Sequence, residues 1–255
     1  MARTFVISDA HGYPELIQNA LGHGAFDPER DDFVYAGDLF DRGPDVAACI
    51  ELVETYATQV LLGNHDVAVL LDFLVYPQDP ENRRFRPLLI DRVVNADLAD
   101  AWKVATCVEG VLISHAGVSS EYEPVLVEEC EGDPALLAQH LNDTFLNAVR
   151  AELESGERDE QGILGDDGPT WFRPFPWSDL HPLAGVRQVV GHTPPVGDLE
   201  AVDFHMVDPC AFYGMEDSKR FRYAVIEDGE VTVVEGSLDP SGSCGPRKEL
   251  AEVCP

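Results

Sequence analysis

The amino-acid sequence predicts an α/β fold, because short apolar runs alternate with stretches of helical periodicity along the chain. Each of five apolar runs ends in turn-forming or polar residues, as buried strands that lead into loops do. With 255 residues, of which 45% are hydrophobic, the chain is long enough for a large domain with a sizeable core. We therefore expect a single domain over residues 1–255, with insertions at about 66–105 and 120–186.

Polar residues directly follow each of the five predicted strands. The strands are expected over residues 5–7, 33–36, 60–62, 111–113 and 189–190, and the segments after them read SDAHG, GDLFDRG, GNHD, SHAG and GHT. Ligands bind to α/β sheets at the carboxyl edge of the strands. One polar residue after one strand is common by chance, whereas one after every core strand is not. We therefore expect these residues to share one site.

Helical periodicity separates the first strands and fills much of both insertions. Apolar positions 16, 17, 20 and 21 follow Pro14, and positions 46, 49, 50 and 53 follow Pro44, which is well placed to start a helix. The first insertion is expected to be helical. A longer helix is expected over 134–153 in the second insertion, which ends in an irregular Gly, Pro and Trp stretch. Near the end, Asp228-Gly229 between two apolar runs predicts a β-hairpin.

The chain is strongly acidic, with 47 Asp and Glu residues against 17 Lys and Arg, and a formal net charge of −30. Such a surface repels nucleic-acid phosphates, so we expect no nucleic-acid partner. Charge of one sign destabilises the compact state unless salt screens it. The composition therefore favours a protein that works in high salt over an ordinary acidic cytosolic protein.

No membrane or secretion signal is expected. No segment approaches the roughly 18 consecutive apolar residues of a membrane span, and the first apolar run is too short for a signal-peptide core. We therefore expect a cytoplasmic protein with no membrane partner. The six Cys residues form no Cys-x-x-Cys pair, so no thiolate zinc site is expected. Cys49 and Cys107 should be buried thiols, and pairing of Cys244 with Cys254 stays open.

Six of the polar residues after the strands have side chains that bind metals. Each motif alone also has an ordinary structural interpretation, such as a helix cap at Asn64 or Asp66, or a surface ion pair between Asp41 and Arg42. Together the groups form a mixed oxygen and nitrogen set, which suits Mn, Fe, Zn, Co or Ni better than Ca or Mg. We expect divalent transition ions, with Mn preferred, on Asp9, His11, Asp38, Asn64, His115 and His192.

In this order, the five motifs resemble those of the calcineurin-like metallophosphoesterases. Segments 37–43 (GDLFDRG) and 63–66 (GNHD) resemble the phosphoprotein phosphatase branch, and more narrowly its bacterial and archaeal members, which include diadenosine tetraphosphate hydrolases. The resemblance extends over residues 8–193. It implies an α/β fold of two facing mixed β-sheets flanked by helices. It also implies hydrolysis of a phosphate ester by a metal-activated water, without a phosphoenzyme.

The resemblance implies two metal ions and a role for each residue of the site. Asp38 would bridge the two ions. The first ion would be completed by Asp9 and His11, and the second by Asn64, His115 and His192.

Four further residues take catalytic roles by the same resemblance. His65 would be the general acid that protonates the leaving group, and Asp41 would orient it and favour its charged form. Arg42 and Arg173 would bind the phosphate oxygens, since planar guanidinium groups suit a tetrahedral dianion. Asp66 stands where many members of this branch carry Glu, which leaves open the structural contact of this shorter acid.

The preferred substrate is a phosphorylated protein side chain, serine or threonine and by extension tyrosine. Between residues 106 and 186 the chain holds only Arg150 and Arg158 besides Arg173, so a tetraphosphate bridge would meet few cations. The alternative is symmetrical hydrolysis of a dinucleoside polyphosphate such as diadenosine tetraphosphate, whose bases could stack on aromatic residues at 171, 172, 175 and 177. An inactive phosphoprotein-binding scaffold is disfavoured, because every catalytic position is filled.

Overall fold

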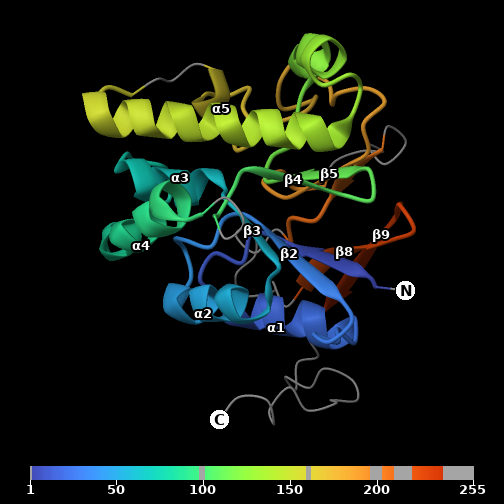
Figure 1. Cartoon of the computed structure of the whole chain (residues 1–255). Coiled ribbons are helices and arrows are strands. Elements are labelled where there is room, and N and C mark those ends of the chain that lie inside the picture. Colours follow the sequence, from blue (N-terminus) through green and yellow to red (C-terminus); the bar gives the residue numbers. More distant parts are fainter. Residues whose placement is uncertain (1, 98–100, 159–161, 196–202, 210–219, 238–255) are drawn as a thin grey trace.

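Two mixed β-sheets face each other at the centre of the molecule (Figure 1). The computed structural model describes residues 2–97, 101–158, 162–195, 203–209 and 220–237. The larger sheet has the strand order β3-β2-β1-β8-β9. Its first three strands are parallel, and the last two run antiparallel to their neighbours. The strands are β1 (Thr4–Ile7), β2 (Asp32–Ala36), β3 (Gln59–Leu61), β8 (Arg220–Glu227) and β9 (Glu230–Ser237).

The smaller sheet has the order β4-β5-β6-β7. In it β5, β6 and β7 are parallel, and β4 pairs antiparallel with β5 at the edge. Each sheet thus has parallel strands whose carboxyl ends lie at one edge, so the loops that follow these strands can lie close together. The strands are β4 (Ala105–Val108), β5 (Val111–Ser114), β6 (Gln188–Val190) and β7 (Phe204–Met206).

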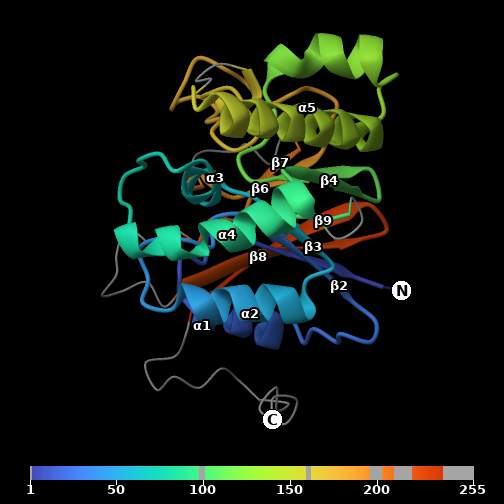
Figure 2. The same cartoon turned by 60° about the vertical axis from the view of Figure 1, so that its left-hand side comes forward.

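Helices cover the outer faces of the two sheets. In both views α1 and α2 lie on one side of the sheets and α5 lies on the other (Figure 2). The helices α3 and α4 belong to the first insertion, which also forms a 3-10 helix over Pro80–Phe85. The bounds are α1 (Pro14–His23), α2 (Val46–Tyr56), α3 (Asn64–Leu71), α4 (Arg86–Ile90) and α5 (Pro134–Ser155).

Alternating side chains of the central strands fill two separate layers of core. In β1, Phe5 and Ile7 pack toward the helices, whereas Val6 packs between the sheets. β2 repeats the pattern, with Phe33 and Tyr35 toward the helices. Because successive side chains of a strand point to opposite faces, a strand buried on both faces is an unbroken apolar run. The sequence shows such runs for this reason.

The structure confirms the five expected strands and the hairpin of β8 and β9 around Asp228-Gly229. It confirms the helix after Pro14, the long helix of the second insertion, and the helical first insertion. One expected helix start was wrong, because α2 begins at Val46 and not at Pro44. Asp45 is the N-cap of α2, since its carboxylate accepts a hydrogen bond from the Ala48 N–H at 3.0 Å.

The cysteines partly follow expectation. Cys49 is buried, and burial raises the pKa of its thiol to about 12. Cys107 is only half-buried, contrary to expectation, because it lies on the edge strand β4. Cys244 and Cys254 lie outside the described residues. Among the residues that the structure describes, no helix has the length and apolar character that a membrane span requires.

Candidate metal centre

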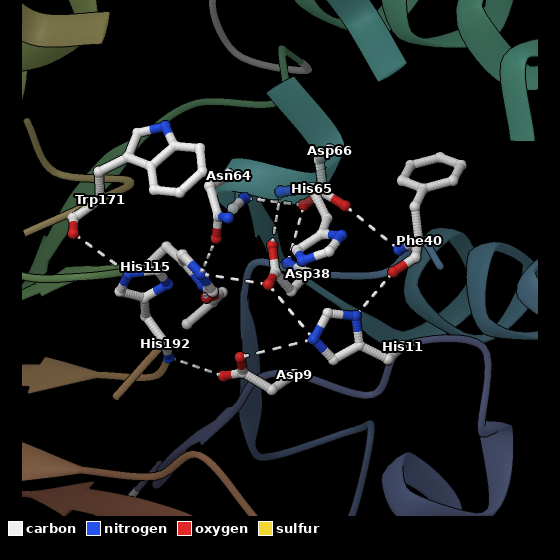
Figure 3. A network of polar contacts seen from close by, with 12 residues as sticks. Asp9, His11, Asp38, Phe40, Asn64, His65, Asp66, His115, Trp171 and His192 are labelled. Carbon is white, nitrogen blue, oxygen red and sulfur yellow. Dashed lines mark hydrogen bonds and ion pairs between the residues drawn. The ribbon is translucent and has the colours of Figure 1, made fainter. Parts of the chain in front are cut away.

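Six side chains from the five motifs converge at the carboxyl edge of the parallel strands (Figure 3). Within the described residues, two groups have ligand atoms that lie within 4.8 Å of one another: His11 with Asp38 and His65, and Asp38 with His115 and His192. All of these residues are buried. Because Asp38 belongs to both groups, its carboxylate occupies the position expected of a bridge between two ions.

Asp9 and Asn64 lie beside these two groups. Asp9 Oδ1 is 4.0 Å from His11 Nε2, and Asp9 Oδ2 accepts the His192 N–H at 3.0 Å. Asn64 Oδ1 lies 3.2 Å from His115 Nε2. The structure therefore brings all six expected ligands together, and it places His65 in the first group as well.

The loops around the centre contain residues in a left-handed backbone conformation, which residues other than glycine rarely adopt. Asp9, His11, Asp38 and His192 all have positive φ, between 46° and 63°. Such a conformation costs about 1–3 kcal/mol for a residue with a side chain and persists where surrounding contacts enforce it. Here the Asp9 N–H donates to Gly37 O at 2.9 Å and the His11 N–H donates to Asp38 O at 3.0 Å. Strained backbone concentrated in one place is typical of a functional site.

Two glycines permit the close approach of neighbouring loops. A Cβ at Gly63 would lie 2.1 Å from Asp38 Oδ1, and a Cβ at Gly191 would lie 2.1 Å from Asp9 Oδ2. Any side chain at either position would displace a carboxylate of the centre. The glycines beside these motifs are therefore part of the geometry of the site.

Backbone carbonyls orient the three ligand imidazoles. His11 Nδ1 lies 2.7 Å from Phe40 O, and His115 Nδ1 lies 2.9 Å from Ala36 O, so each ring holds its hydrogen on Nδ1 and turns Nε2 toward Asp38. His192 is reversed, because its Nε2 lies 3.1 Å from Trp171 O and leaves Nδ1 free of that hydrogen. In metal sites, a histidine ligand regularly donates its other ring N–H to a backbone carbonyl or a carboxylate.

Two acceptors face each other in the centre. Among the residues that the structure describes, buried His11 Nε2 has no hydrogen-bond partner, and it lies 3.3 Å from Asp38 Oδ2. With the ring hydrogen on Nδ1, no donor stands between these two atoms. A cation between them would satisfy both, so the donor set fits a divalent ion of the kind that takes oxygen and nitrogen ligands.

Burial and charge set the protonation of these groups. Burial opposes ionisation of Asp38, but the neighbouring histidines outweigh it and hold its pKa well below the usual value. Burial lowers the pKa of His11 to about 3 and that of His192 well below its usual value. Burial also acts to lower the pKa of His115, but Asp38 and Asp9 outweigh it and raise that pKa to about 9. His11, Asp38 and His192 thus hold the forms that bind metals, whereas His115 retains a proton.

The four expected catalytic residues lie around the centre. His65 Nδ1 is 2.6 Å from Asp41 Oδ2, which confirms the expected pairing. Arg42 Nη2 lies 3.3 Å from His65 Nε2. Arg173, on the opposite side, donates through Nη1 to His192 O at 3.0 Å and to Thr193 Oγ1 at 3.4 Å. Two guanidinium groups therefore flank the cluster.

Asp66 holds two of the loops together. Its carboxylate accepts the N–H groups of Gly63 at 2.7 Å, Asp38 at 2.8 Å and Leu39 at 2.9 Å. Gly63 is the N-cap of α3, and Asp66 is the third residue of that helix. Its side chain accepts the N–H of the N-cap residue, as in a capping box, so of the two expected capping residues, Asn64 and Asp66, it is Asp66 that caps the helix. The aspartate is long enough for this contact. Its links to the loop after β2 had no signal in the sequence.

Three further histidines, His23, His140 and His181, have their contacts outside the cluster. His23 Nδ1 is 3.0 Å from the hydroxyl of Tyr223, and His140 Nδ1 is 3.3 Å from Glu129 Oε2. His181 lies beside Phe175, with ring centroids 6.4 Å apart. These contacts are those of packing and surface residues.

Two facing sheets with a carboxylate and imidazole cluster at their shared edge define a hydrolase-type metal centre. Residues 2–213 match the family model of calcineurin-like phosphoesterases, and the chain belongs to that family. Among curated relatives, the symmetrical bis(5'-nucleosyl)-tetraphosphatase of Edwardsiella ictaluri is 29% identical over 159 residues, 59% of this chain and 56% of the relative. That of Klebsiella pneumoniae is 29% identical over 158 residues, with the same shares. The match spans a little over half the length of these relatives.

Solved structures share the fold. The cold-active protein tyrosine phosphatase of a Shewanella species superposes with a TM-score of 0.60 at 20% identity, over 94% of this chain and 81% of that one. A serine/threonine phosphatase from Saccharomyces cerevisiae gives a TM-score of 0.59 at 13% identity, over 92% and 80%. At these identities the likeness concerns the fold alone, and it confirms the two-sheet architecture.

Proposed function

We propose that this chain is a two-metal phosphoesterase that splits a dinucleoside polyphosphate symmetrically, so that a dinucleoside tetraphosphate gives two nucleoside diphosphates. The observation that carries the proposal is the position of Asp38, whose carboxylate is shared by two groups of ligand atoms. In this proposal Asp9 and His11 complete one site, and the other is completed by Asn64, His115 and His192. Two bound ions would supply Lewis-acid activation of the phosphoryl group and of the attacking water. Mn is the preferred ion, with Fe, Zn, Co or Ni as alternatives.

The chain's own residues would position the phosphate and the leaving group. Arg42, which contacts His65, and Arg173, which contacts His192 O, would bind non-bridging phosphate oxygens. In the proposed reaction, water would add to one of the two central phosphorus atoms and release a proton to solvent. The bond from that atom to the oxygen between the two central phosphorus atoms would break. The departing nucleoside diphosphate takes a proton from His65, which Asp41 orients through Nδ1.

Relatives and charge support different substrates. The curated relatives carry the name of the symmetrical tetraphosphatase, which favours the dinucleotide over the phosphoprotein that the sequence placed first. Exposed aromatic rings agree with this order. Tyr76 is 90% exposed and lies shortly before Asp79, which contacts Asp41 through its N–H, and Trp177 is 51% exposed and lies shortly after Arg173. Exposed rings in these two segments offer surfaces on which bases can stack.

A phosphoprotein remains the second candidate, because the strongly acidic chain offers few cations for a tetraphosphate. The net charge of −30 would repel a substrate with about four negative charges more than one with two. A phosphorylated side chain needs only Arg42 and Arg173. This argument concerns long-range charge and is weaker than the direct sequence similarity to named relatives.

A comparison of catalytic efficiency decides between the substrates. Diadenosine tetraphosphate and a phosphoserine or phosphothreonine peptide are offered at the same metal and salt concentrations, and products are separated by chromatography. We expect two ADP as the nucleotide products and at least about tenfold higher kcat/KM for the dinucleotide, a difference of about 1.4 kcal/mol in transition-state stabilisation. Higher efficiency on the peptide, or ATP and AMP as products, would contradict the proposal.

A further inference from the structure

A residue outside the five motifs contacts the Asp41–His65 pair. Asn82 lies in the 3-10 helix Pro80–Phe85 of the first insertion and is only 3% exposed. Its Nδ2 donates to Asp41 Oδ1 at 2.9 Å. The N–H of Asp79 donates to the same oxygen at 3.0 Å. Asp41 therefore uses one oxygen for His65 and the other for the first insertion.

The local structure holds Asn82 in place. The Asp79 carboxylate caps the 3-10 helix by accepting the Glu81 N–H at 2.9 Å, and the Asn82 N–H donates to Asp79 O at 3.0 Å. At the other end of the helix, Phe85 packs on Phe40, next to Asp41, with ring centroids 5.6 Å apart. The amide of Asn82 therefore reaches Asp41 from a fixed platform.

The two donors matter because Asp41 has no contact with solvent. A buried carboxylate loses its hydration, and hydrogen bonds to its ionised form restore part of that loss. Donors on Oδ1 also fix the plane of the carboxylate, and Oδ2 then fixes the ring of His65 through the 2.6 Å contact with Nδ1. Misplacement of a reacting group by 1 Å can cost about 100-fold in rate.

We propose that Asn82 is a positioning residue for proton transfer to the leaving group: it holds the Asp41 carboxylate, and through it the His65 ring, in the orientation that donates. The inference rests on the proposed function in that His65 acts as the general acid. It assigns a catalytic purpose to the first insertion, which otherwise contributes none of the expected site residues beyond α3.

The first test compares two ester types. Asn82→Ala removes the donor, and Asn82→Asp replaces it with a group of nearly the same shape that accepts instead. We expect kcat on an alkyl phosphate to fall roughly 10- to 100-fold in both variants, with KM changed less than about twofold. On an aryl phosphate, whose leaving group needs less protonation, the loss should stay below about threefold. Equal losses on both esters, or none, would overturn the proposal.

A matched control and a double variant separate positioning from folding. Gln78 also lies in the first insertion, and its amide donates to Phe73 O at 3.1 Å without contact to Asp41; Gln78→Ala should leave both rates unchanged. Once His65→Asn has removed the acid, adding Asn82→Ala should cause no further loss on the alkyl ester. A further tenfold loss would show that Asn82 supports the fold rather than the acid.

A spectroscopic measurement gives a readout that does not depend on turnover. In metal-free protein with ¹⁵N-labelled histidine, the Nδ1 proton of His65 is assigned by its absence in His65→Asn. We expect its exchange with solvent to accelerate at least about tenfold in Asn82→Ala and to remain unchanged in Gln78→Ala. Unchanged exchange in Asn82→Ala would overturn the inference even where the wild type hydrolyses phosphate esters. A wild type without activity would instead contradict the proposed function, and the exchange rates would still decide whether Asn82 holds the pair.

Discussion

Each of the three imidazoles that we expect to bind metal has one ring nitrogen in contact with a backbone carbonyl, which leaves the other nitrogen for the ion. Phe40 O and Ala36 O hold the Nδ1 hydrogens of His11 and His115. The same ring of His115 lies between carboxylates that outweigh its burial and raise its pKa to about 9. The fold thus determines which ring nitrogen of these expected ligands carries a hydrogen. His115 carries one proton that a bound ion would have to displace.

Metal binding should therefore release protons. Below pH 9 the metal-free protein holds His115 charged, and a ligand imidazole must be neutral, so each ion bound at that site displaces a proton. We expect at least about one proton released at pH 7.5, and an affinity that rises with pH and levels off above about 9. Calorimetry in buffers of different ionisation enthalpy measures the number. Equal heats in all buffers would contradict the assignment of His115 as a ligand.

His65 should act on the leaving group rather than on the metals. His65→Asn removes the acid while the six expected ligands stay in place. We expect unchanged metal content and a loss of roughly 10²- to 10⁴-fold in kcat on an ester with a poor leaving group. The loss should shrink for an aryl phosphate. Metal analysis and kinetics on both esters check this, and lost metal would mean that His65 is a ligand.

Residues of the site differ in how well the sequence predicts them. The six expected ligands follow apolar runs directly, so their convergence follows from strand geometry. Asn82 follows no strand, and no spacing rule connects an insertion to a residue 41 positions earlier. Asp66 was visible as a helix cap, but its bonds to Asp38 and Leu39 depend on how two loops approach each other in space.

At the scale of elements, the loops after β2 and β3 are joined through the start of α3. The Asp66 carboxylate accepts backbone N–H groups from both loops. Buried N–H groups without an acceptor cost about 1–3 kcal/mol each. The Asp66 side chain thus helps to fix the spacing of the two loops.

Asp66→Asn should loosen this junction. The amide offers one oxygen where the carboxylate offered two, and its NH₂ would face backbone donors. We expect a fall of about 2 kcal/mol or more in the free energy of unfolding, which corresponds to about 4 to 8 °C in melting temperature, together with weaker metal binding. Asp72→Asn, at the exposed end of the same helix, is the control and should change neither. Thermal unfolding with and without metal tests this, and a melting temperature like that of the wild type would contradict it.

The elements themselves were largely predictable, with two exceptions. Runs such as 5–7 and 33–36 are buried on both faces and read as strands without ambiguity. β7 has only three residues, with the half-buried His205 at its centre, and β4 is an edge strand of mixed character. Periodicity over three or four residues carries too little information to mark such strands.

For the whole molecule, the charge of −30 is the dominant physical feature. Part of this charge comes from carboxylates of the buried centre, such as Asp9 and Asp38, and the proposed ions would offset it. Self-repulsion of the surface acts over about 10 Å in 0.1 M salt and over about 3 Å at 1 M. Stability should therefore depend on ionic strength to an unusual degree.

Molar salt should stabilise the protein strongly. We expect a melting temperature that rises steeply between dilute buffer and about 1 M KCl, because screening weakens a repulsion that is stronger in the compact state than in the unfolded chain. The measurement is best made on metal-loaded protein, so that ion binding does not change along the series. A flat curve would mean that the acidity has no role in adaptation to salt.

Metal-dependent turnover tests the proposed centre most directly. Purified protein is analysed for metals, stripped with a chelator, and assayed for ADP release from diadenosine tetraphosphate before and after Mn, Mg or Ca is restored. A centre built around Asp38 predicts up to two transition ions per chain, loss of activity on stripping, and better recovery with Mn than with Mg or Ca. Asp38→Asn should recover little with any of them. Hydrolysis that survives the chelator in protein without any metal ion would contradict the two-metal centre.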